Sequence, residues 1–266
     1  MTLNDLFYPF GVEIKRISTK YKYMKLFSKH STKKRYIPCI VNIDGENFLV
    51  PDSPSFAWQI REIFAENSYL FETTNSNPII LDIGANIGIS VLWFKKHYPF
   101  STIYAFEADA HIYEILEKNI GNFSDVHLFN KAVWNSNEML SFHSDGADGG
   151  SVLPAKADEK KVQGIRLKEF ISDFKKIDFL KIDIEGAETV VLQDCYDALQ
   201  NIDNIFIEYH SFNQEKQLLG NILEILTNNG FRYYIKNVGY KRPLPFVDKQ
   251  VGDMMDMQIE IIGYRI

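Results

Sequence analysis

The chain has 266 residues, 45% of them hydrophobic, so it can bury a full core, and its length suits one α/β domain with an appendage. Its two cysteines, Cys39 and Cys195, lie far apart, match no metal-binding spacing and suggest no disulfide framework. The sequence has no run of about 18 apolar residues, and residues 1–11 lack the pattern of a signal peptide. These features favour a globular enzyme and predict a cytoplasmic location.

The net charge of −6 is unevenly distributed. The segment from Lys15 to Arg35 holds nine Lys or Arg and no acid, whereas the remainder of the chain is acidic. Within it, Ile17, Tyr21 and Met24 recur at helical spacing, which is typical of a basic amphipathic segment that contacts an anionic membrane surface. The simpler alternative is a solvated basic arm whose apolar residues pack on the protein.

Residues 1–77 are expected to form an N-terminal extension ahead of the main domain, residues 78–266. The extension combines the basic segment with a hairpin over Tyr36–Val50, which turns at Asp44-Gly45. A helix should follow, capped by Ser53 and with proline at its first position. Its simplest role is that of a lid over a ligand cleft.

A glycine-rich turn follows the first predicted strand of the main domain. Ile79–Leu81 is a short apolar run typical of a buried parallel strand, and Gly84 and Gly88 then allow a sharp turn into a helix. The first N–H groups of such a helix are free to point at a ligand. The next strand ends at Glu107, about where an acid binds a ribose diol in nucleotide-binding folds.

The turn departs from the dinucleotide-binding motif G-x-G-x-x-G. Asn86 replaces the middle glycine, which in that motif lets the backbone approach a pyrophosphate. A nucleoside cofactor without phosphate fits better, and we expect the methyl donor S-adenosylmethionine. A dinucleotide site and a purely structural crossover are the alternatives.

Strand and helix signals alternate through most of the domain. Residues 131–168 interrupt this alternation and indicate an inserted hairpin with a mobile tip at Gly146–Ser151. The remaining predicted elements are helices Ile87–His97, Asp109–Ile120, Ala187–Leu199 and Gln214–Asn228, and strands Thr102–Phe106, Val126–Phe129, Ile177–Ile182, Ile205–Glu208, Phe231–Ile235 and Met257–Tyr264. They predict an α/β fold with a doubly wound, mostly parallel sheet of seven strands, the last pair forming an antiparallel edge and ligands binding at the carboxyl ends of the strands.

Polar residues gather where the fourth and fifth core strands end. Asp183 and Glu185 follow one strand, and Glu208 and His210 close the other. Methyl transfer to oxygen needs a group that takes the hydroxyl proton, and a histidine or a carboxylate can do so. His210 is the first candidate because its ordinary pKa lies near neutral pH, with Asp183 and Glu185 next, as bases or as groups that orient a diol.

Other roles for these residues stay open. Asp183, Glu185, Glu208 and His210 could hold Mg or Mn, although we favour a site without metal. Asp183 and Glu185 could simply cap the next helix, and His210 could be an ordinary loop histidine. Glu188 is expected to make a structural contact.

Four segments together resemble the FkbM family of S-adenosylmethionine-dependent methyltransferases: Leu81–Ser90, Phe106-Glu107, Lys181–Glu188 and Ile207–His210. The resemblance covers about residues 78–236, and Lys-x-Asp-x-Glu-Gly-Ala-Glu is its most specific part. One departure is Ala108, where many members have proline. The resemblance implies a Rossmann-like class I methyltransferase fold and O-methylation, often of sugar hydroxyls in natural products, glycans or glycolipids.

The expected site residues fall into two groups. The cofactor site comprises Asp82, Gly84, Ala85, Asn86, Gly88, Ser90, Glu107, Ala108, Asn130, Lys131, Ala132 and Asp183, with residues 130–132 near the adenine. The acceptor site comprises Glu185, Glu208 and His210, and catalysis is assigned to His210, Asp183 and Glu185. The leading function is O-methylation of a small-molecule or glycan substrate. Nucleic-acid methylation, which the acidic remainder of the chain disfavours, and a non-catalytic nucleoside-binding scaffold are the alternatives.

Overall fold

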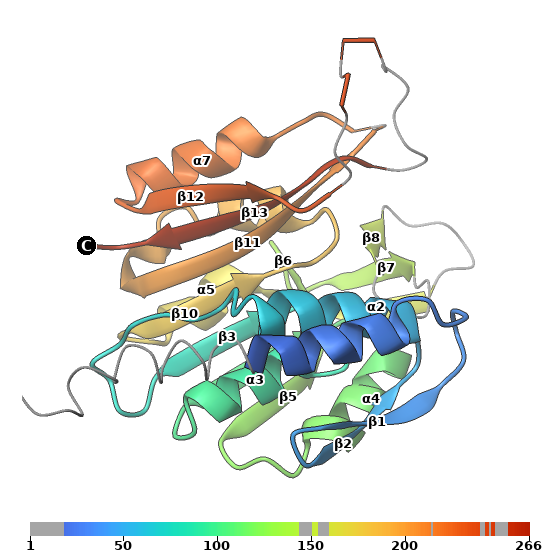
Figure 1. The fold of residues 1–266 in the computed structure, drawn as a ribbon. Helices are drawn as coiled ribbons and strands as arrows, with labels where there is room; N and C mark the ends of the chain where they lie inside the picture. Colours follow the sequence, from blue (N-terminus) through green and yellow to red (C-terminus); the bar gives the residue numbers. More distant parts are fainter. Residues whose placement is uncertain are drawn as a thin grey trace, which may run out of the picture. The chain divides into compact units, whose positions relative to one another are not determined.

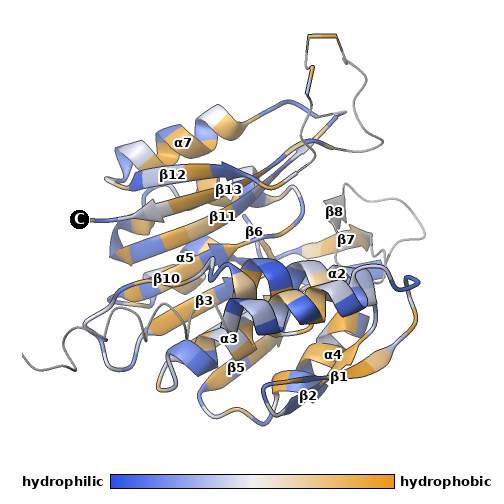
Figure 2. Ribbon diagram, viewed as in Figure 1, coloured by the Kyte–Doolittle hydropathy of each residue, from blue (hydrophilic) through white to orange (hydrophobic). Residues whose placement is uncertain are grey.

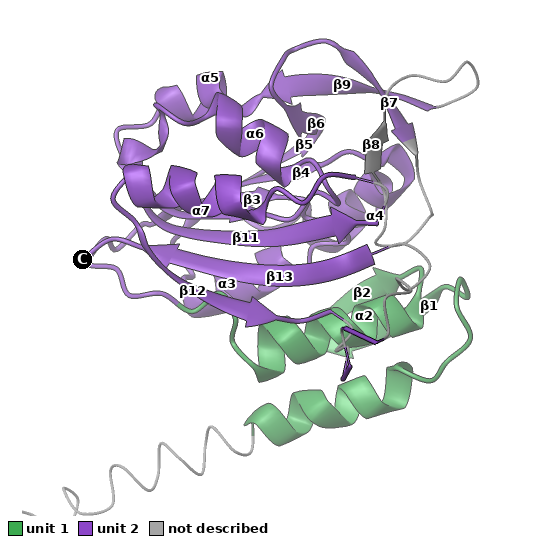
Figure 3. Ribbon diagram, turned by 90° about the horizontal axis from the view of Figure 1, so that it is seen from above, with its two compact units in different colours: residues 1–70 green, residues 71–266 purple. Residues whose placement is uncertain are grey.

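The structure is a computed structural model that describes residues 19–143, 151–153, 160–213, 215–239, 243–244, 246–247 and 255–266 (Figure 1). The chain divides into two compact units, Met1–Leu70 and Phe71–Ile266, which are coloured separately in Figure 3. Within the described ranges, no helix combines the length and the apolar character needed to cross a membrane.

The first unit contains the predicted hairpin and helix. Strands β1 (Cys39–Ile43) and β2 (Glu46–Val50) pair in antiparallel fashion around Asp44-Gly45. Helix α2 (Ser53–Gln59) continues into a π-helical turn, Ile60–Ala65. Asp52 caps this helix, because its extended backbone lets its carboxylate accept the N–H of Ser55. The prediction of Ser53 as the cap was therefore wrong by one residue.

Residues 19–30 of the basic segment are helical. The apolar side chains on one face of this helix pack within the first unit, where Tyr23 contacts Phe64 with ring centroids 4.9 Å apart. Phe27 and His30 make similar contacts with Trp58 and Phe56. Tyr21 is 72% exposed, and Ile17 lies outside the described residues. Packing within the unit thus engages much of the apolar face, and a contact with a membrane stays a prediction.

The second unit is built on a seven-stranded sheet with the order β12-β13-β11-β10-β3-β4-β5. All strands are parallel except β13, which is antiparallel to both neighbours. This confirms the predicted α/β, Rossmann-like architecture and its antiparallel edge. The strands are β3 (Ile79–Ile83), β4 (Thr102–Glu107), β5 (Val126–Asn130), β10 (Ile177–Ile182), β11 (Ile202–Phe212), β12 (Arg232–Asn237) and β13 (Met255–Tyr264).

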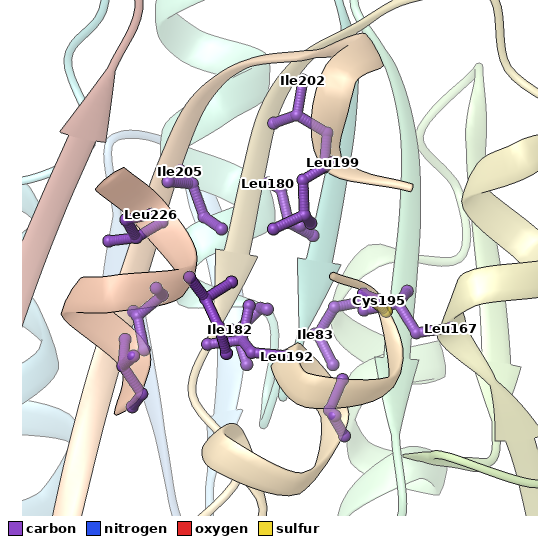
Figure 4. Close-up of a cluster of buried hydrophobic side chains, with 14 of the residues drawn as sticks. Ile83, Leu167, Leu180, Ile182, Leu192, Cys195, Leu199, Ile202, Ile205 and Leu226 are labelled. Carbon is purple, nitrogen blue, oxygen red and sulfur yellow. The ribbon is translucent and has the colours of Figure 1, made fainter. Parts of the chain in front are cut away.

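Helices cover both faces of the sheet, so its central strands are hydrophobic along most of their length (Figure 2). Leu180 and Ile182 pack into a buried cluster with helices α5 to α7 on one face (Figure 4). The alternate residues point the other way, where Phe179 contacts Phe94 of α3. The helices are α3 (Ile89–His97), α4 (Ala110–Ile120), α5 (Leu167–Ser172), α6 (Glu188–Asp194) and α7 (Leu219–Asn228).

Several predicted boundaries differ from the observed ones. Strand β11 is longer than predicted because it pairs with β13 from Asn204 to Phe212. Helix α6 ends at Asp194, and a short 3₁₀ turn, Leu199–Asn201, leads into β11. Helices α3 and α7 begin two and five residues later than predicted, at Ile89 and Leu219.

The predicted inserted hairpin is a small sheet of four strands with the order β6-β9-β7-β8. Strands β7 (Met139–His143) and β9 (Lys160–Arg166) form the expected antiparallel pair. In addition, β6 (Ala132–Trp134) runs parallel to β9, and β8 (Ser151–Leu153) pairs with β7. Residues 144–150, which hold most of the predicted mobile tip, lie outside the described residues.

Candidate functional site

The glycine-rich turn between β3 and α3 lies directly against the chain that leaves β10. The N–H groups of Gly84 and Ala85 both donate to the carbonyl of Phe106, at 3.0 and 2.9 Å. Gly84 has a φ of +85°, and a Cβ at this position would lie only 1.8 Å from the carbonyl oxygen of Asp183. Glycine is required here because both the backbone conformation and the available space exclude a side chain.

Glu107, at the end of β4, is held by the backbone of the turn. One carboxylate oxygen accepts the N–H of Asn86 at 2.9 Å, and the other accepts the N–H of Asp109 at 2.8 Å. Burial raises the pKa of Glu107 to about 7, although both N–H groups favour the carboxylate. Each oxygen can accept a further hydrogen bond, so the geometry suits two neighbouring hydroxyls such as those of a ribose.

A buried lysine, Lys181, lies beneath the turn. Its Nζ donates to the carbonyl of Gly84 at 2.8 Å and lies 3.3 Å from Asp82 Oδ1 and 3.4 Å from Asp183 Oδ2. Burial opposes the charge of Lys181, but the two aspartates outweigh it and raise its pKa. The hydroxyl of Ser90 donates to the other oxygen of Asp82. Lys181 therefore connects the glycine-rich turn to the loop after β10.

That loop is organised by Glu188, whose side chain is fully buried. Its carboxylate accepts the N–H groups of Ile184 and Gly186 at 3.1 to 3.2 Å. Glu185 and Gly186 both have positive φ, +55° and +102°. A Cβ on Gly186 would lie 2.7 Å from the ring of Phe212. Glu188 thus satisfies backbone donors that a tight, buried turn would otherwise leave without partners.

Glu188 also fixes the imidazole of His210, which projects from β11. His210 Nδ1 lies 3.0 Å from Glu188 Oε1, so this nitrogen carries a proton that it donates. His210 Nε2 then faces Glu185 Oε2 at 3.5 Å and Glu208 Oε1 at 3.7 Å. Burial opposes a charge on His210, but the carboxylates of Glu188, Glu185 and Asp183 raise its pKa well above its usual value.

The structure brings most of the predicted residues together at the carboxyl edge of the sheet. The solvent-accessible members of the predicted cofactor site are Gly84, Asn86, Glu107, Ala108, Asn130, Lys131 and Asp183. Asn130 donates to the carbonyls of Glu107 and Ala108. The buried members are Asp82, Ala85, Gly88, Ser90 and Ala132. These buried residues pack beneath the accessible ones. All of the predicted contacts with a cofactor stay predictions.

Two supporting residues were not assigned a functional role from the sequence. Lys181 and Asp178 are the two charged residues of the fully buried strand β10, and a lysine in such a position indicates a buried ion pair. Glu188 was expected to make a structural contact, and its bond to His210 could not be inferred because the two residues are 22 positions apart.

A separate groove of about 710 Å³ lies at the opposite end of the sheet. It is lined by residues that precede β3 and β10, by the end of α3 and the residues after it, and by the start of β11, including Asn75, Tyr98, Lys176 and Asp203. It contains none of the predicted site residues. The candidate site is therefore the carboxyl edge, where ligands bind in open α/β sheets.

The fold and the glycine-rich turn define this unit as a Rossmann-like class I methyltransferase domain. The family model described as the methyltransferase FkbM domain matches residues 82–233, and the chain belongs to this family. The match includes Glu107 and the whole segment from Lys181 to His210.

Two individual relatives share only about a quarter of their aligned residues with this chain. The chain is 26% identical over 210 residues to 31-O-demethyl-FK506 methyltransferase FkbM from Streptomyces tacrolimicus. This alignment covers 64% of this chain and 80% of that protein. The chain is 27% identical over 154 residues to 2-O-methyltransferase NoeI from Sinorhizobium fredii, covering 50% and 63%. A solved FkbM methyltransferase from Methylobacillus flagellatus aligns with a TM-score of 0.46 and 12% identity, covering 90% and 59%. The chain spans 66% and 71% of two further curated methyltransferases.

Proposed function

We propose that the protein is an S-adenosylmethionine-dependent O-methyltransferase whose acceptor is a hydroxyl of a sugar or glycoconjugate. Membership of the FkbM family supports methyl transfer. The names of two relatives support transfer to oxygen, and a third relative is a hexuronic acid methyltransferase from Haloferax volcanii, which supports a sugar acceptor.

The position of Asp183 carries the proposal. Its backbone lies against Gly84 of the glycine-rich turn, while its side chain belongs to the same cluster as Glu185 and His210. A cofactor held by the turn and by Glu107 would therefore present its reactive end next to groups that bind hydroxyls. Such proximity is the main requirement of a transfer between two bound molecules.

The cofactor supplies a methyl group bonded to a positively charged sulfur. In the transfer, the acceptor oxygen forms the new C–O bond, the C–S bond breaks with its electron pair on sulfur, and the hydroxyl proton leaves to a base. Asp183, Glu185 and His210 are the candidates for holding the hydroxyl and taking this proton. His210 can act as the base only when its Nε2 is unprotonated, while the carboxylates can accept the proton directly.

Labelled S-adenosylmethionine with a panel of sugar nucleotides and glycans tests this proposal. We expect transfer to a hydroxyl, and a His210→Gln variant that loses at least about 100-fold in kcat while its affinity for the cofactor changes little. Glu224→Gln, an exposed acid on α7, is the matched control and should behave as wild type. Transfer only to nitrogen or carbon would reject O-methylation, and a folded protein that binds no S-adenosylmethionine would reject the proposal as a whole.

A further inference from the structure

The side chains after β10 and β11 form a group of mixed oxygen and nitrogen donors. One carboxylate oxygen each from Asp183 and Glu185 and one imidazole nitrogen of His210 all lie within 4.8 Å of one another. Small side-chain rotations would bring three such atoms to the bond lengths of about 2.1 Å that Mg and Mn require. Glu208 lies next to this group, and the carboxylate of Glu208 accepts a hydrogen bond from the side-chain amide of Gln258.

The orientation of His210 is a second, independent observation. Its side chain is 1% exposed, and Nδ1 is engaged by the fully buried Glu188. Nε2 is thereby aimed into the cluster, where it lies 3.5 Å from Glu185 Oε2 and 3.7 Å from Glu208 Oε1. Histidine ligands of metals commonly have this arrangement, because a carboxylate that accepts the far N–H fixes the ring and directs the other nitrogen at the ion.

The charge around the imidazole points in the same direction. Glu188, Glu185 and Glu208 have carboxylate oxygens at 3.0, 3.5 and 3.7 Å from its two nitrogens, and Asp183 belongs to the same donor group. Converging carboxylates repel one another unless a positive charge lies between them, and either a protonated imidazole or a bound cation can supply this charge. Lys181 meets Asp183 from beneath the sheet edge, but it is shared with Asp82.

We infer that Asp183, Glu185 and His210 Nε2 bind one divalent cation, with Mn preferred over Mg because one ligand is an imidazole nitrogen. Glu188 is the positioning residue that aims the imidazole. Three protein ligands would leave coordination positions for the oxygens of an acceptor, and this part rests on the proposed function.

Titration of MnCl₂ into the chelator-treated, full-length protein tests the site, followed by calorimetry and by the loss of the free Mn²⁺ electron paramagnetic resonance signal. We expect one bound ion per chain. Asp183→Asn and Glu185→Gln should each weaken binding at least about 100-fold, and Glu188→Gln about 10- to 100-fold. Glu224→Gln should leave it unchanged. Circular dichroism of each variant shows whether it is folded, and Glu185→Gln, whose side chain is partly exposed and keeps nearly the same shape, is the variant least expected to unfold.

Two results would overturn the inference: no Mn²⁺ binding by folded wild-type protein, or binding that Asp183→Asn and Glu185→Gln leave unchanged. Methyl transfer is measured separately, with and without chelator. Transfer that proceeds at an equal rate with chelator, together with absent Mn²⁺ binding, rejects the cation site and leaves the proposed function intact. If the protein binds one ion tightly but transfers no methyl group to any hydroxyl, the cation site is supported and the proposed function is rejected.

Discussion

Glu107 and Glu188 are both acids at the carboxyl edge of the sheet, yet their surroundings differ. Glu107 accepts only backbone N–H groups in the contacts that we describe, from Asn86 and Asp109. Glu188 accepts backbone N–H groups too, but it also orients the side chain of His210. The part of the candidate site around Glu107, which we propose binds the cofactor and call the cofactor half, is thus shaped by the main chain. The part around His210, which we propose binds the acceptor and call the acceptor half, depends on contacts between side chains. The first suits a neutral diol, and the second suits charged or strongly polar chemistry.

The largest effect is expected from Gly84→Ala, because this position joins the two halves. A Cβ would lie 1.8 Å from the carbonyl oxygen of Asp183, at a φ of +85°. Left-handed strain and overpacking together should cost about 4 kcal/mol of the free energy of unfolding, measured by denaturant titration. Cofactor binding should be lost in whatever protein remains folded.

Gly230→Ala is the matched control for this change. Gly230 also has a positive φ, +77°, but the nearest atom to its Cβ would be the end of the Arg265 side chain, at 3.2 Å. This variant should lose only about 1 kcal/mol. Equal losses in the two variants would show that backbone strain alone matters and that Gly84 does not form a tight junction with Asp183.

An intermediate effect is expected at Glu107, which belongs to the cofactor half. Glu107→Gln should weaken S-adenosylmethionine binding about 10- to 100-fold at pH 8, because hydrogen bonds to a charged acceptor are the stronger ones. Since the pKa of Glu107 is about 7, the affinity of the wild type should fall as the pH drops from 8 to 6. Titration calorimetry across this range measures both, and Glu114→Gln on α4 serves as the exposed control.

The pH dependence of folding stability that Glu107 causes is opposite to that of cofactor affinity. The pKa of Glu107 is raised from 4.5 to about 7 in the folded chain, so its burial favours folding most below pH 4.5, and this contribution is lost as the pH rises through 7. Glu107→Gln should therefore reduce the pH dependence of the affinity for S-adenosylmethionine and of the free energy of unfolding. A variant that binds the cofactor as tightly as wild type, with an unchanged pH profile, would remove Glu107 from the site.

The same contrast explains what could be predicted from the sequence. Gly84 and Glu107 were identified because strand, turn, helix, strand and acid follow one another in a local pattern whose geometry is set by the backbone. The role of Glu188 could not be found in this way, because its contact with His210 joins the start of helix α6 to strand β11, at positions far apart in the sequence. Strand β11 runs to Phe212 rather than Glu208, so His210 is a buried strand residue and not a loop residue.

The smallest effect is expected from the basic segment, which belongs to the first unit and supplies none of the residues assigned to the candidate site. Lys25 and Lys29 are exposed on the helix of residues 19–30, and replacing both by alanine should change the free energy of unfolding by no more than about 0.5 kcal/mol. Affinity for S-adenosylmethionine and for Mn²⁺ should be unchanged. Binding of RNA or DNA should be weak in both proteins at physiological salt, as measured by fluorescence anisotropy.

A different result would change the assignment of the acceptor. Each phosphate contact contributes a slope of about 0.9 to the logarithmic salt dependence of nucleic-acid binding. Tight binding by the wild type, with a steep salt dependence that becomes shallower when Lys25 and Lys29 are replaced, would favour nucleic-acid methylation. That outcome would leave the cofactor half as proposed and reassign only the acceptor half, because the acids around His210 would then face a ribose or base rather than a free sugar.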